Sequence, residues 1–300
     1  MKVRNVKQTV VIILFALFIS IGAYAQPEKD GVFYSITHAG SKNTSWLFGT
    51  YHLIKDSYLK ELPAVTNAFK KSKGLITEVV IDSSELAMEN SKAFLSNKKL
   101  TDFISSDFAD SLDAILKADL GQSIEQLQPY KPMTVMLTLS MIYLIKDNQM
   151  LLSKYSGCPL DAYFTNESKL NGKTITPLET ITQQMDILFS TISDEKQATM
   201  LKRFIRDKVR NIEQGNALLK AYFNNDLDSI YKIYTQTLTE GDDQDFLIKN
   251  RNETWMKILP TLIDEQSQFI AVGALHLAGP GGLITQLKKM GYTVKPVNLK

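Results

Sequence analysis

Gln-Phe-Ile-Ala-Val-Gly-Ala-Leu-His, from Gln268 to His276, contains the strongest strand signal of this 300-residue chain and ends in a histidine. The stretch from Trp46 to His52 has the same order: an apolar run, a glycine, and a histidine three residues later. Each stretch predicts a strand that leaves its sheet through a glycine turn and carries an imidazole just beyond it. The chain has three histidines, so this pattern accounts for two of them.

Shorter β-like segments accompany these two stretches near both ends of the chain. Residues 32–37 and 45–50, separated by a polar turn with Gly40, predict an opening hairpin. A helix-like segment at 59–71 followed by a strand-like segment at 75–80 implies parallel strand pairing. The remaining strand predictions are 172–179, 268–273 and 292–297.

The middle of the chain has helical spacing of its apolar residues. The clearest helical segments are 100–120, 134–152, 182–238 and 246–263, and another is expected at 283–290. Strands at the two ends with helices between them predict an α/β fold. We expect one domain, residues 26–300, whose mixed sheet core is formed by N- and C-terminal parts, with an inserted helical cap at about 84–265.

The first 25 residues are typical of a secretory signal peptide. Basic residues precede the apolar run Val10 to Ile19, which is shorter than the roughly 20 residues that span a bilayer. Ala23-Tyr24-Ala25 is typical of a signal peptidase site, so we predict cleavage after Ala25 and export to the periplasm or the medium. An uncleaved segment would instead anchor the protein in the membrane.

Charge excludes one class of partner. Removing residues 1–25 takes away three basic residues and no acidic one, so the formal net charge changes from +2 to −1. A nearly neutral chain has no electrostatic basis for binding nucleic acid. The single cysteine, Cys158, excludes an internal disulfide and thiolate metal clusters, so any metal must have nitrogen and oxygen ligands.

The two glycine-linked histidines are the first candidates for a functional site. Ligands of open α/β sheets bind beyond the carboxyl ends of the strands, where His52 and His276 would both lie. An imidazole there can ligate a metal ion or carry a proton. The third histidine, His38, falls in the predicted hairpin turn, and we expect it to be non-catalytic.

Two glutamates are the next candidates. Glu78 and Glu179 lie in or at the end of β-like runs, where a carboxylate needs a compensating cation. That cation could be a metal, a protonated histidine or Arg251. Simpler interpretations also stay open: Glu179 could be a carboxylate at a helix N-terminus, and Arg251 an ion-pair partner only. Asp161 could reach the site, although N-capping is its default role.

Several of these segments resemble the TraB/PrgY/GumN family. The resemblance is carried by Trp46–Leu53, Phe269–Leu283, Leu178–Thr180, Asn250–Asn252 and Leu287–Val297, and it spans nearly the whole mature chain. The family is similar to a wider group that includes the Tiki metalloproteases, the erythromycin esterases and the haem-binding ChaN proteins. The resemblance implies an α/β sheet core with inserted helices. Similarity to Tiki implies that His52, Glu78 and His276 hold a divalent metal ion such as manganese or cobalt.

These observations together predict an exported metal-dependent hydrolase, a peptidase, acting on a peptide or small molecule. The metal would activate a water molecule, Glu179 would act as general acid/base, and Arg251 would stabilise the developing oxyanion. One alternative is a metal-free hydrolase with a histidine as general base, as the erythromycin esterases suggest. The other is a periplasmic haem, iron or peptide-binding protein without turnover.

Overall fold

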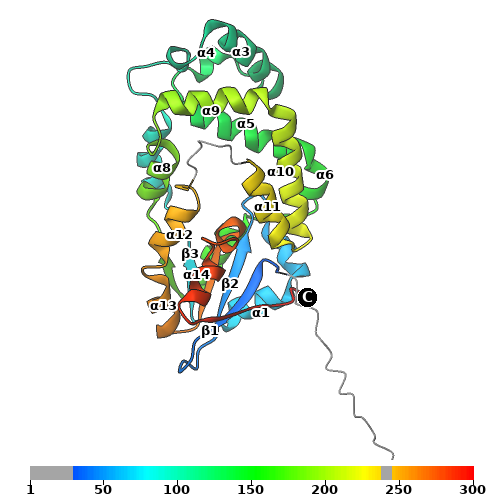
Figure 1. Cartoon of the computed structure of the whole chain (residues 1–300), viewed down its shortest axis with the longest axis vertical. Coiled ribbons are helices and arrows are strands. Elements are labelled where there is room, and N and C mark those ends of the chain that lie inside the picture. The colour runs from blue at the N-terminus through cyan, green and yellow to red at the C-terminus, as the bar shows by residue number, and fades with distance from the viewer. Residues whose placement is uncertain (1–29, 238–244) are drawn as a thin grey trace, which may run out of the picture.

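The computed structural model of the chain describes residues 30–237 and 245–300. The predicted signal peptide, residues 1–25, lies outside the described residues. The described part has a six-stranded sheet with the order β4-β3-β5-β2-β1-β6 (Figure 1). The strands are β1 (Phe33–Thr37), β2 (Ser45–Thr50), β3 (Gly74–Thr77), β4 (Thr174–Pro177), β5 (Gln268–Gly273) and β6 (Thr293–Pro296).

The sheet is mixed. Strands β4, β3, β5 and β2 run parallel to one another, whereas β1 is antiparallel to both β2 and β6. In the central pair, Trp46 lies opposite Phe269 and Thr50 opposite Gly273, although more than 200 residues separate them in the chain. The predicted α/β fold, with a sheet built from N- and C-terminal parts, is therefore confirmed.

Aromatic side chains fill the space beside the central strands. Phe48 on β2 and Phe269 on β5 contact Phe164 of α7 (Leu160–Leu170), with ring centroids 5.9 and 4.8 Å away. All three side chains are fully buried. Burial of each stabilises the fold by roughly 1.5–3 kcal/mol, so the predicted strands are fixed by packing on the sheet face as well as by strand pairing.

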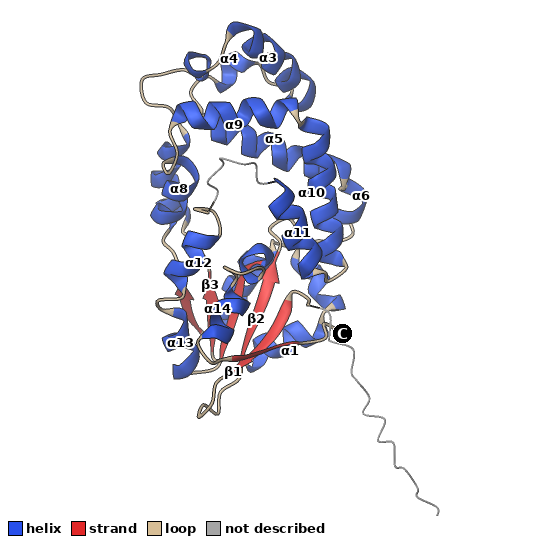
Figure 2. Ribbon diagram, viewed as in Figure 1, coloured by secondary structure: helices blue, strands red, loops and turns tan. Residues whose placement is uncertain are grey.

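The helices form two groups. Those nearest the sheet are α1 (Pro63–Lys71), α7, α13 (Leu259–Glu265) and α14 (Leu283–Lys289). The others form an arch above the sheet (Figure 2). They are α2 (Ser83–Glu89), α3 (Ser106–Leu120), α4 (Ile124–Leu127), α5 (Pro132–Asp147), α6 (Gln149–Leu152), α8 (Ile181–Phe189), α9 (Asp194–Arg206), α10 (Lys208–Phe223), α11 (Leu227–Thr237) and α12 (Lys249–Trp255).

Short 3₁₀ helices complete the chain. They are η1 (Asp56–Glu61), η2 (Asn90–Ala93), η3 (Leu100–Phe103) and η4 (Ala274–Leu277). In the part of the chain that the structure describes, no helix is both long enough and apolar enough to cross a bilayer.

Three local expectations were wrong. The helix expected at 246–263 is two helices, α12 and α13, and Pro260 lies in the first turn of the second, where its missing N–H is tolerated. Strand β3 ends at Thr77, so Glu78 follows the strand instead of lying inside it. Helix α7 has Pro159 at its N-cap, and Asp161 makes no cap hydrogen bond.

Candidate functional site

Four parallel strands bring the candidate residues to one edge of the sheet. Glu78 directly follows β3 and Glu179 lies two residues beyond β4, and the Glu179 N–H donates to the Glu78 carbonyl at 2.8 Å. His52 lies two residues beyond β2, and His276 lies in η4 directly after β5. Because the carboxyl ends of parallel strands meet at one edge, residues far apart in sequence converge here.

Arg251, in the first turn of α12, lies at the centre of this group. Its Nε and Nη2 donate to the two carboxylate oxygens of Glu179, both at 2.8 Å, which is a bidentate pair. Nη2 also donates to Glu78 at 2.7 Å. Nη1 donates to the Leu247 carbonyl at 3.2 Å and lies 3.1 Å from His276 Nε2. Each of the five guanidinium N–H groups therefore has a hydrogen-bond acceptor among the described residues.

The cluster formed by Glu78, Glu179, Arg251 and His276 is almost closed to solvent. The exposed fraction of the side chain is 12% for Arg251, 9% for Glu78, 5% for Glu179 and 4% for His276. The indole N–H of Trp255 adds a hydrogen bond to Glu179 at 2.9 Å. Two carboxylates and one guanidinium leave the cluster with an excess negative charge when His276 is neutral.

Glu78 stays ionised in this cluster. Burial by itself raises the pKa of Glu78, but His276, Arg251 and the Gly273 N–H, which donates at 2.7 Å, outweigh it and lower the pKa to about 2. His276 is neutral at neutral pH, because burial lowers its pKa to about 3. Arg251 and the Gly273 N–H therefore carry the effect on Glu78 under those conditions.

His52 differs from His276 in almost every respect. Its side chain is 71% exposed, and its Nδ1 lies 2.8 Å from the Asp161 carboxylate. Thr50, at the end of β2, donates to the other oxygen of Asp161 at 2.6 Å. The hydrogen bond to Asp161 raises the pKa of His52 to about 9. Asp161 thus orients an imidazole that solvent can reach.

The two glycines of the repeated pattern are needed for close approach. A Cβ on Gly49 would lie 2.9 Å from the backbone of Ala274, where β2 passes η4. A Cβ on Gly273 would lie 3.2 Å from the carboxylate of Glu78, which the Gly273 N–H contacts. Both glycines therefore leave room for a neighbour that the site requires.

The metal site expected from the resemblance can be compared with these contacts. In residues 30–237 and 245–300, no three His, Cys, Asp or Glu side chains are grouped so that they could hold a metal ion. Both oxygens of Glu78 and Nε2 of His276 already have hydrogen-bond partners, and the cation between them is the guanidinium of Arg251. In this arrangement Glu78 and His276 offer no free ligand atom to a divalent ion. The metal at His52, Glu78 and His276 therefore rests on the resemblance alone.

The structure also adds residues that sequence reasoning missed. Asn252 accepts from His276 Nδ1 at 2.7 Å, and Trp255 bonds Glu179. Tyr222 of α10 donates to the carbonyl of Gly49 at 2.8 Å from the helical part of the molecule. Asn252 stands beside Arg251 in a segment already noted in the sequence, but the contacts of Trp255 and Tyr222 have no local sequence signal.

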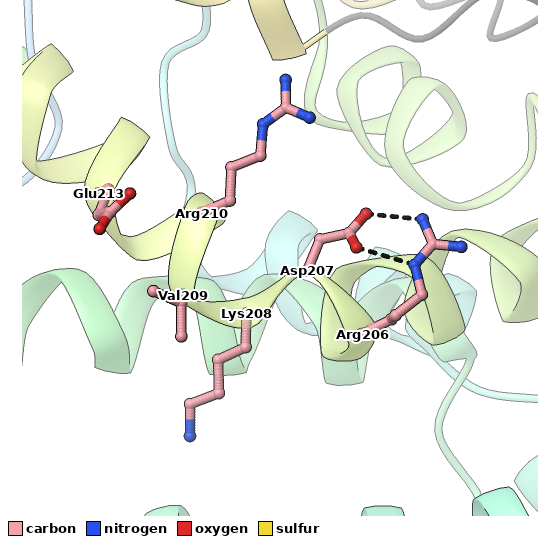
Figure 3. A pocket seen from close by; sticks show the side chains of 6 residues that line it. All are labelled: Arg206, Asp207, Lys208, Val209, Arg210 and Glu213. Atoms are coloured by element: carbon pink, nitrogen blue, oxygen red, sulfur yellow. Dashed lines mark hydrogen bonds and ion pairs between the residues drawn. The ribbon is translucent and has the colours of Figure 1, made fainter.

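Other polar features lie apart from this site. A pocket at the junction of α9 and α10 is lined by Arg206, Asp207, Lys208, Val209, Arg210 and Glu213 (Figure 3). In this pocket Arg206 is paired with the neighbouring Asp207 at 2.7 Å, so the positive charge of Arg206 is already compensated. His38 pairs with Asp264 at 3.2 Å, in the hairpin turn at the far end of β2 from His52.

The sheet and this site define an α/β protein with a helical arch and a buried Arg–Glu cluster beside an exposed His–Asp pair. The chain belongs to the TraB/PrgY/gumN family, whose model matches residues 32–296. It has no significant match among curated proteins or among solved structures.

Proposed function

We propose that this protein is a hydrolase in which His52 transfers protons for a water nucleophile. The observation that carries this proposal is the His52–Asp161 pair: Nδ1 is 2.8 Å from a carboxylate, while 71% of the imidazole side chain is exposed. Asp161 accepts the Nδ1 proton, so the neutral ring has its lone pair on Nε2. This is the pairing that orients a catalytic histidine in hydrolases.

The reaction needs one base that later becomes an acid. In its neutral form, which accumulates as pH rises toward the pKa of about 9, His52 takes a proton at Nε2 from a water molecule as the water oxygen bonds to the substrate carbonyl carbon. The imidazolium, stabilised by Asp161, then gives this proton to the leaving nitrogen or oxygen as its bond to the carbonyl carbon breaks. Such proton transfer contributes about 10²–10⁴-fold to a rate.

The buried cluster has a supporting role in this proposal. Arg251 holds the side chains of Glu78 and Glu179 in place at the carboxyl ends of β3 and β4, because it donates hydrogen bonds to both carboxylates. Its role as an oxyanion stabiliser, expected from the sequence, would require one of five existing hydrogen bonds to break. The acid/base role of Glu179 would likewise require it to leave Arg251 and Trp255. Both roles remain predictions, and the geometry favours His52.

Substrate class and location come from the sequence. The family resemblance favours a peptide bond as the target, and the N-terminal segment favours a site of action outside the cytoplasm. Both belong to the proposal. The proposal follows the metal-free alternative raised from the sequence, in which a histidine is the general base. In addition, it makes Arg251 the cation that compensates Glu78 and Glu179.

The test is hydrolysis of a peptide mixture, followed by mass spectrometry, and of p-nitrophenyl esters, with and without a strong chelator. We expect turnover in chelator and a loss of about 10²–10⁴-fold in His52→Ala. We also expect a loss in the same direction in Asp161→Asn at a pH above about 9, where His52 is in its base form in both proteins. The matched control is His38→Ala, which removes a histidine hydrogen-bonded to another aspartate, Asp264. Full activity in His52→Ala, or activity only with an added metal ion, would contradict the proposal. Intact peptide recovered from a tight complex would favour a binding protein.

A further inference from the structure

Asn252 is a fully buried amide that lies against the backbone of the second glycine–histidine segment. Its Nδ2 donates to the carbonyl of His276 at 3.0 Å and to the carbonyl of Gly281 at 2.8 Å. Its Oδ1 lies 2.7 Å from Nδ1 of His276. The side chain thus holds the backbone and the ring of one residue at the same time.

These contacts fix the direction of the hydrogen bond to the ring. Two carbonyl oxygens can only accept, so the amide atom between them must be the NH₂ group. The other amide atom is then the oxygen, which has no proton to give. The 2.7 Å contact at His276 therefore requires a proton on Nδ1.

The opposite side of the ring agrees with this direction. Nε2 of His276 lies 3.1 Å from Nη1 of Arg251, and a guanidinium can only donate. Nε2 must therefore carry the lone pair. In a neutral imidazole this places the single ring proton on Nδ1. Contacts from two independent side chains select the same neutral tautomer.

We propose that Asn252 is a positioning residue that fixes His276 as the Nδ1–H tautomer, so that its Nε2 accepts from Arg251 and His52 alone carries protons. The two histidines follow equivalent strands, but each has a different partner at Nδ1: Asp161 for His52 and Asn252 for His276. This assignment rests on the proposed function for its kinetic consequence only, since the tautomer can be observed without a substrate.

The choice of asparagine over aspartate has a physical reason. At position 252 a side chain must donate twice to carbonyl oxygens and accept once from a ring. An ionised carboxylate would place an oxygen against the carbonyls of His276 and Gly281, where it cannot donate. It would also add a negative charge beside a cluster that already has an excess of one. Only the amide satisfies all three contacts.

The direct test is ¹⁵N NMR of the histidine side chains in the full protein. The chain has three histidines, so the variants His38→Gln and His52→Gln assign the remaining signals to His276. We expect a pyrrole-like Nδ1 and a pyridine-like Nε2 for His276, unchanged between pH 6 and 8. In Asn252→Leu we expect both nitrogens to shift part of the way toward averaged positions, because the ring has lost one of its two selecting contacts and only the Arg251 donor at Nε2 remains. The matched control Asn250→Leu, an exposed position two residues away, should leave the spectrum unchanged.

The wild-type spectrum alone can overturn the assignment. A pyrrole-like Nε2 in His276 would mean that the ring donates where the structure requires an acceptor, whatever happens in the variants. If Asn252→Leu folds and keeps the wild-type pattern, Asn252 does not select the tautomer. Loss of hydrolysis in His52→Ala is a separate readout, so a failure of the proposed function and a failure of this assignment give different results.

Discussion

The buried cluster makes a strong prediction for Arg251→Met. Methionine keeps the unbranched chain but removes the guanidinium, which leaves Glu78 and Glu179 with exposed fractions of 9% and 5% and without their cation. Removing one partner of a buried ion pair destabilises a protein by about 3–5 kcal/mol. Because domains are stable by only about 5–15 kcal/mol, this is a large part of the total.

The measurement is urea unfolding at pH 7, followed by circular dichroism. Arg206→Met is the matched control, because the Arg206 side chain is 70% exposed and its guanidinium is also paired with a carboxylate, that of Asp207, at 2.7 Å. Solvent screens such an exposed pair, so we expect little or no change in the unfolding midpoint. An Arg251→Met protein that is as stable as Arg206→Met would refute the view that Arg251 neutralises the buried carboxylates.

The double variant Arg251→Met/Glu179→Gln separates charge from packing. Replacing Glu179 by glutamine removes one of the two buried negative charges that Arg251→Met leaves uncompensated, and it nearly conserves the shape of the side chain. We expect recovery of part of the lost stability, with a coupling of about 0.5–3 kcal/mol between the two positions. Strictly additive effects of the two substitutions would show that the loss comes from packing of the Arg251 stem.

Three further predictions concern pH and the strand ends. Because the hydrogen bond to Asp161 raises the pKa of His52 to about 9, the base form of His52 accumulates only as pH rises through that value. The rate of hydrolysis should therefore rise with pH up to about 9. A pH–rate profile of Asp161→Asn that superimposes on the wild-type profile would contradict this. Burial lowers the pKa of His276 to about 3 from an ordinary value of 6.5. Between these values the unfolded chain binds a proton that the folded chain does not, so the thermal unfolding temperature should fall as pH drops below about 6.5, and less so in His276→Gln. Gly49→Ala would place a Cβ 2.9 Å from the backbone of η4 and should destabilise by about 1–3 kcal/mol. Gly215→Ala, where the nearest atom is 3.5 Å away, should not, and equal effects of the two would count against the close-approach argument.

Much of the sheet could be predicted from the sequence because strand signals are local. The run 268–273 is β5, and the hairpin strands lie within one residue of their expected ends. The position of Glu78 was less certain, because an apolar run that continues past Thr77 has no local mark for where pairing stops. Pairing with both neighbours stops at Thr77, which lies opposite Pro177 of β4 and Ala271 of β5.

The site could be predicted only in part. The strand-end argument placed His52 and His276 on one edge of the sheet, whereas Glu78 and Glu179 were singled out as carboxylates in or at the end of β-like runs. The partners of the two histidines come from helices distant in sequence, Asp161 from α7 and Asn252 from α12. No pattern within either segment indicates which ring it contacts. The difference between an exposed histidine paired with Asp161 and a buried histidine paired with Asn252 therefore becomes visible only in the assembled fold.

The central claim is that Arg251, rather than a metal ion, is the resident cation of this site. The most direct measurement is isothermal titration calorimetry of the chelator-treated protein with Mn²⁺ and Co²⁺ at pH 7, with metal analysis of the freshly purified sample. The account predicts no stoichiometric metal in the sample and no saturable binding, because Arg251 already occupies the acceptor atoms of Glu78, Glu179 and His276. One tightly bound ion per chain, with binding weakened by His276→Ala, would contradict it.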